Sequence, residues 1–158
     1  TSSFVAKKVD FGSAVDAGAP GHVAELPFTL PFAAPEVLTW TDTDRKKADV
    51  YSVGIAMYGL STSTTPFNSA RNTDPTFAHY SGMGVGESFA RYFFGTYRFY
   101  PSSPAKLAAT MDILDGTLKI NPADRFDIDQ VAVALLAMGV DVPGSTRLTC
   151  PPTPTFGA

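Results

Sequence analysis

The sequence is poor in cysteine and in charge. Its 158 residues include one cysteine, Cys150, so an internal disulfide cannot form. This scarcity favours a reducing compartment, and we expect an intracellular, cytoplasmic protein. Charged residues make up 17% of the sequence and the net charge is −3, which argues against a nucleic-acid partner.

Long apolar runs are also missing. The longest, VAVALLAMGV at 131–140, is too short to cross a bilayer, and no basic-plus-apolar signal peptide opens the chain. We therefore expect no membrane partner. The first residue is Thr1 rather than Met, so we expect a fragment or a processed product.

The residues that are present predict one globular, mainly helical domain. Hydrophobic residues make up 44% of the sequence, enough for one sizeable core. FVAKKV at 4–9 predicts a short strand, and residues 13–28 predict a long loop. Pro35 is placed to begin a helical turn over 35–40.

Residues 48–60, ADVYSVGIAMYGL, are apolar on nearly every helical face, which predicts a helix buried all round. Asp49 and Ser52 are the exceptions, and a buried carboxylate at 49 would need hydrogen-bond donors. Further helices are predicted over 75–80, 104–118 and 128–138, the last capped by Asp127. The tail at 141–158 predicts disorder.

Four short motifs follow one another along the chain: Asp-Phe-Gly at 10–12, Ala-Pro-Glu at 34–36, DVYSVG at 49–54, and Arg125 after INPAD. Together they resemble the C-terminal lobe of a eukaryotic-type protein kinase, from about Val5 to Met138. The resemblance implies a mainly α lobe fragment of the α+β kinase fold at 1–140, with a short N-terminal β-strand. The disordered tail would follow at 141–158.

The resemblance also implies roles for the first motif. Asp10 would bind the Mg²⁺ ion that bridges the phosphates of ATP. Phe11 would pack between the lobes, and Gly12 would let the joint turn. The alternative interpretation of this motif is a turn aspartate beside a core phenylalanine.

The segment from 10 to 36 would be the activation segment of the kinase. Thr29 would steady the catalytic aspartate, as in serine/threonine kinases, and residues 31–33 would shape the pocket beside the phosphoacceptor. Between Gly12 and Thr29 the only hydroxyl side chain is that of Ser13. We therefore expect that phosphorylation of this loop does not switch the protein.

The remaining motif residues would be structural. Glu36 and Arg125 resemble the buried ion pair of the family, in which arginine meets the carboxylate with two parallel hydrogen bonds. Asp49 resembles the residue that accepts backbone N–H bonds from the catalytic loop.

Several kinase groups are absent from the sequence. Neither His22 nor His79 is followed by Arg-Asp, so residues 1–158 contain no H-R-D catalytic loop, and the glycine loop and ATP-binding lysine are also missing. The chain alone should be catalytically incomplete, and helix 48–60 should expose an apolar patch that promotes association.

Two functions remain open on this evidence. The first is the C-lobe part of a serine/threonine kinase, a transferase that uses ATP and Mg²⁺ on a protein substrate. The second is a non-catalytic, kinase-like interaction module, a pseudokinase or a truncated relative, which the missing upstream half favours. The expected partner besides a protein substrate is the missing kinase half, in cis or from another chain.

Other candidate features carry less weight. Gly82 and Gly84 could begin a G-x-G-x-x-G nucleotide loop, but Glu87 stands where its third glycine would be. The aromatic segment 88–100 favours core packing over base stacking. The two histidines have no companions at metal-ligand spacing. Asp127 and Asp129 indicate a helix cap rather than a calcium loop.

Overall fold

A computed structural model describes residue 14 and residues 29–39, 44–83 and 104–139. The predicted strand at 4–9, the Asp-Phe-Gly joint, the aromatic segment 88–100 and the tail 141–158 lie outside the described residues. Within the described residues all regular structure is helical. The elements are η2 (Leu30–Phe32), α1 (Pro35–Leu38), α2 (Arg45–Thr62), α3 (Pro75–Gly82), α5 (Pro104–Thr117), η3 (Pro122–Asp124) and α6 (Ile128–Ala137). The predicted mainly helical fold is confirmed for this part of the chain.

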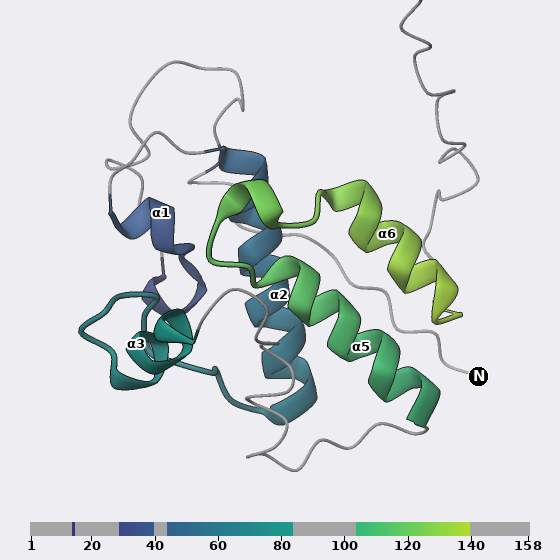
Figure 1. Ribbon diagram of the computed structural model, residues 1–158. Coiled ribbons are helices and arrows are strands. Elements are labelled where there is room, and N and C mark those ends of the chain that lie inside the picture. The colour runs from purple at the N-terminus through teal and green to yellow at the C-terminus, as the bar shows by residue number, and fades with distance from the viewer. Residues whose placement is uncertain (1–13, 15–28, 40–43, 84–103, 140–158) are drawn as a thin grey trace, which may run out of the picture.

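Helix α2 is the central element. In Figure 1 it runs through the middle of the molecule, with α1 and α3 on one side and α5 and α6 on the other. Asp44 caps its N-terminus by accepting hydrogen bonds from the backbone N–H groups of Lys46 (3.0 Å) and Lys47 (3.2 Å). The helix ends at Thr62, and the next residue, Ser63, turns the chain into the following loop with a φ of 60°.

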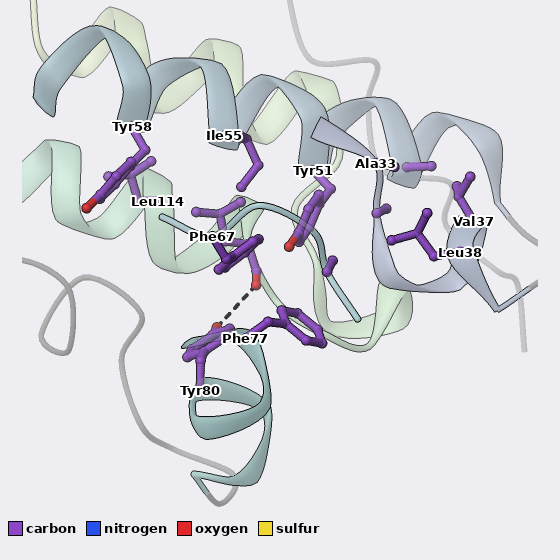
Figure 2. Packing of buried hydrophobic residues seen from close by; sticks show 14 residues of the cluster. Ala33, Val37, Leu38, Tyr51, Ile55, Tyr58, Phe67, Phe77, Tyr80 and Leu114 are labelled. Atoms are coloured by element: carbon purple, nitrogen blue, oxygen red, sulfur yellow. Dashed lines mark hydrogen bonds between the residues drawn. The ribbon is translucent and has the colours of Figure 1, made fainter. Parts of the chain in front are cut away.

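The main core lies against α2 (Figure 2). Tyr51, Ile55 and Tyr58 of α2 have no exposed surface, and neither does Leu114 of α5. The three α2 residues are spaced three to four positions apart, so they form one continuous buried stripe on that helix. Further members include Leu38 of α1, Phe67 of the loop before α3, and Phe77 and Tyr80 of α3.

A second, smaller cluster joins α2 to α5 and α6. Its fully covered members are Val50, Ile113 and Val131, one from each helix. Two glycines allow close packing beside it. A Cβ on Gly54 would lie 2.4 Å from the Thr117 hydroxyl oxygen, and one on Gly116 would lie 2.2 Å from the Phe126 ring.

Helix α3 is held by Asp74. Its carboxylate accepts hydrogen bonds from the backbone N–H groups of Thr76 (2.9 Å) and Phe77 (3.1 Å), and from that of Asn68 (2.8 Å). One side chain therefore caps the helix and fixes the loop that leads into it.

The prediction that α2 is buried on all sides was wrong. Asp49 and Ala56 are exposed, Val53 is 37% exposed and Leu60 is 88% exposed. These residues follow one another at helical spacing, so they form one exposed stripe opposite the core. The physical reason is that the described elements pack against only part of the helix circumference. A carboxylate at position 49 is therefore not forced by burial to find donors.

Candidate functional site

The site is built around Glu36, at the start of α1. Ala34 has an extended backbone (ψ 152°), as expected before a proline, and Pro35 begins the helix. This places Glu36 in the first turn of α1, whose four residues are all buried. The Glu36 side chain is 8% exposed, so its carboxylate needs a charged or hydrogen-bonded partner.

Arg125 reaches the same place from the other end of the described chain. Asn121 caps the short η3 turn by accepting from the backbone N–H of Ala123 (3.1 Å). The backbone N–H of Phe126 donates to the carbonyl of Gly116 (2.9 Å), which ties the turn back to α5. Between these two anchors the Arg125 side chain points inward with no exposed surface.

The structure brings Glu36 and Arg125 together in a bidentate pair. Nη1 of Arg125 lies 2.6 Å from Oε1 of Glu36, and Nη2 lies 3.1 Å from Oε2. This parallel geometry is the strongest form of a carboxylate–guanidinium contact. The guanidinium also donates to three backbone carbonyls, those of Lys47 (2.7 Å), Lys119 (3.1 and 2.9 Å) and Ile120 (3.3 Å).

The pair therefore connects three segments that are distant in sequence. The Nζ of Lys47 donates back to the carbonyl of Arg125, so α2 and residue 125 are joined in both directions. The guanidinium carbon of Arg125 also lies 5.0 Å from the centroid of the Tyr51 ring, a cation–π distance. We call Glu36, Lys47, Tyr51 and Arg125 the ion-pair cluster.

The ring of Tyr51 is the apolar surface against which the Arg125 guanidinium packs. Burial raises its pKa well above the usual tyrosine value, the neighbouring Tyr80 and Glu36 act in the same direction, and Arg125 opposes them. Its hydroxyl has no hydrogen-bond partner among the described residues. The ring, rather than the hydroxyl, makes the contact with Arg125.

The segment before α1 carries Thr29 on the surface. Thr29 precedes η2 and its side chain makes no capping hydrogen bond. The turn is joined to α2 by Ser52, whose hydroxyl donates to the carbonyl of Phe32 at 2.8 Å. The structure thus places Thr29 on a segment anchored at both α1 and α2.

The other residues singled out from the sequence are placed as follows. Asp49 lies on the exposed stripe of α2. Asp10, Phe11 and Gly12 lie outside the described residues. In the described part of the chain no three His, Cys, Asp or Glu side chains form a group that could hold a metal ion. None of the helices described has the length and apolar character needed to cross a membrane.

Sequence reasoning missed Lys47 and Tyr51 as members of the ion-pair cluster. Both residues lie on α2, one helical turn apart, and this i, i+4 spacing is the only signal that relates them. Nothing in the sequence shows that the carbonyl groups of Lys47 and Lys119 accept from Arg125, because backbone acceptors carry no residue signature.

With this geometry established, comparison with known proteins identifies the family. The pattern that defines the protein kinase domain matches residues 2–134. The chain belongs to the protein kinase family. The match includes η2, α1, α2, α3, α5, the first part of α6 and both members of the buried ion pair.

Curated protein kinases resemble the chain over most of its length. It is 29% identical over 150 residues to the mitosis inducer protein kinase cdr1 of Schizosaccharomyces pombe, a match that covers 95% of the chain and 23% of that kinase. It is 30% identical over 129 residues to sperm motility kinases 3A and 3B of Mus musculus, covering 80% of the chain and 22% of each kinase. The chain spans less than a quarter of the length of these protein kinases.

Proposed function

We propose that residues 1–140 form the C-lobe part of a protein serine/threonine kinase that transfers the γ-phosphate of ATP to hydroxyl groups of a protein substrate. The observation that carries this proposal is the bidentate Glu36–Arg125 pair at 2.6 and 3.1 Å, in a chain of the protein kinase family. The pair fixes the end of the segment that contains Thr29, and that segment would border the phosphoacceptor.

In this proposal the sequence motifs supply the reactive groups near the phosphates. Asp10 would hold Mg²⁺, which neutralises phosphate charge during transfer. Thr29, exposed at the start of η2, would steady the catalytic aspartate supplied from outside residues 1–158. Phe11 and Gly12 would form the apolar contact and the flexible joint that follow Asp10.

The rest of the kinase would pack on the exposed stripe of α2. Val53 and Leu60 present apolar surface there, and Asp49 lies on the same stripe, where it would accept backbone N–H bonds from the catalytic loop. The partner would be the other half of the kinase domain, in the same polypeptide or in another chain.

The test is a phosphate-transfer assay on a polypeptide that carries these residues together with an upstream H-R-D loop and N-lobe. We expect transfer of labelled γ-phosphate from ATP to serine in a peptide mixture. Asp10→Asn should reduce kcat by at least about a hundredfold, because the metal clamp supplies several kcal/mol of transition-state stabilisation. Asp129→Asn, an exposed carboxylate on α6, is the matched control and should leave kcat unchanged.

The same assay separates the two functions that the sequence left open. A polypeptide that folds and binds partners yet transfers no phosphate would contradict the kinase proposal and support the non-catalytic interaction module. Residues 1–158 alone should be inactive in either case, so the longer polypeptide gives the deciding result.

A further inference from the structure

Ser52 is a polar residue of α2 that belongs to neither the ion-pair cluster nor the core. A serine inside a helix ordinarily donates to the carbonyl four residues before it. Ser52 has such an acceptor in Ala48, at 3.3 Å, but its shorter contact is the 2.8 Å bond to the carbonyl of Phe32. The hydroxyl therefore connects α2 to a turn 20 residues away.

Among the described residues, apolar burial does little to hold the turn that Ser52 contacts. No residue of η2 is buried, and Leu30 and Phe32 are 44% and 37% exposed. Inside the turn the backbone bonds are Phe32 N–H to Thr29 at 2.9 Å and Ala33 N–H to Leu30 at 3.3 Å. Because apolar burial contributes little at η2, one hydrogen bond from α2 should have a measurable effect on its position.

We propose that Ser52 is a positioning residue that holds the 30–32 turn against α2. By doing so it sets the surface of Leu30 and Phe32 that would meet the segment of the protein substrate next to its phosphoacceptor. Both exposed side chains are apolar, so the matching substrate segment is apolar. The positioning role stands on the contact alone, whereas the substrate role rests on the proposed function.

The first experiment is hydrogen–deuterium exchange of the backbone amides of Phe32 and Ala33 in residues 1–158. Ser52→Ala should increase their exchange rates about two- to tenfold, the value of one hydrogen bond. Ser52→Thr retains the hydroxyl and should restore the slow exchange. Ser61→Ala is the matched control, because Ser61 lies on the same helix and donates within it, to the carbonyl of Met57, four residues earlier, at 2.9 Å.

The outcome of the exchange experiment is decisive for the positioning role. Unchanged exchange at Phe32 and Ala33 in Ser52→Ala, or an equal increase in Ser61→Ala, would overturn it. This result does not depend on catalysis, so it is separate from any failure of the kinase proposal.

The second experiment tests the substrate role in the longer polypeptide. Ser52→Ala should raise KM for a serine peptide with apolar flanking residues about two- to tenfold, and should leave KM for ATP unchanged. A merely structural effect would lower the active fraction and hence the apparent kcat, with both KM values preserved. Equal KM values for apolar and charged peptides in the wild type would overturn the substrate role.

Discussion

At the scale of single residues, the ion-pair cluster depends on mutual compensation of two buried groups. Removing either Glu36 or Arg125 would leave an unpaired charge away from water, at a cost of about 3–5 kcal/mol. Replacing both residues removes the unpaired charge but leaves the backbone carbonyls of Lys47, Lys119 and Ile120 without their donor. The two residues should therefore be strongly coupled rather than independent.

We expect Glu36→Leu and Arg125→Met each to lower the free energy of unfolding by about 3–5 kcal/mol. The double variant should lose less than the sum of the two single losses, by at least about 1 kcal/mol. Urea denaturation of the four proteins of this cycle measures the coupling. Arg71→Met makes the same chemical change at an exposed arginine and should alter stability by less than about 0.5 kcal/mol. Additive losses would mean that the pair contributes no specific interaction.

The residue scale also shows which parts of the site could be predicted. Glu36 and Arg125 were predicted as partners because each belongs to a recognisable motif, and the structure brings them together at 2.6 Å. Lys47 could not be predicted, because its role depends on a backbone carbonyl and on a long flexible side chain. Tyr51 stands inside the DVYSVG motif, but the contact of its ring with Arg125 arises only from tertiary packing.

At the scale of elements, local signals predicted most helix positions well. Pro35, Asp44, Pro75 and Asp127 each lie at or next to a helix start, where proline and short acceptors are favoured. Asp127 and Gln130 form a full capping box, as the predicted start of α6 requires. The exposed stripe of α2 fits the apolar patch expected on this helix without the upstream kinase half. Burial on every face was the wrong expectation, since an apolar pattern does not show which neighbours are present to cover it.

The two aspartate caps provide a prediction at this scale, because they differ in burial. Asp74 is 7% exposed and Asp44 is exposed. Burial opposes ionisation of Asp74, but hydrogen bonds from the backbone N–H groups of Phe77, Asn68, Thr76 and Ser69 outweigh it and lower its pKa. A carboxyl group with a lowered pKa stabilises the fold above its unfolded-state pKa, and this contribution is lost as the pH falls through the folded-state pKa.

We expect Asp74→Ala to lower the free energy of unfolding at pH 7 by about 1–2 kcal/mol and Asp44→Ala by about 0.5–1 kcal/mol, because water replaces the exposed cap more easily. Asp74→Ala should also flatten the decline in stability below about pH 4, near the unfolded-state pKa of aspartate. Urea denaturation between pH 3 and pH 7 measures both effects. Equal losses at the two caps, or an unchanged pH profile, would show that burial does not distinguish them.

At the scale of the whole molecule, two of the described α-helices carry exposed large apolar side chains. Val53 (37%) and Leu60 (88%) lie on α2, and Ile128 and Val133 (both 57%) lie on α6. Scattered exposed apolar residues are ordinary, whereas a continuous apolar surface promotes association. The α2 stripe is also the surface on which the proposed other half of the kinase would pack, so the two helices should respond differently to added charge.

We expect residues 1–158 to self-associate, and Val53→Lys with Leu60→Lys to weaken that association about tenfold or more, because each lysine would place a charge against an apolar surface. The matched pair Ile128→Lys with Val133→Lys should have a smaller effect, and sedimentation velocity over a range of concentrations compares the two. In the longer polypeptide the α2 pair should also lower the free energy of unfolding, whereas the α6 pair should leave it within about 0.5 kcal/mol. A longer polypeptide that tolerates both lysines on α2 without loss of stability would show that no other part of the kinase packs on this stripe.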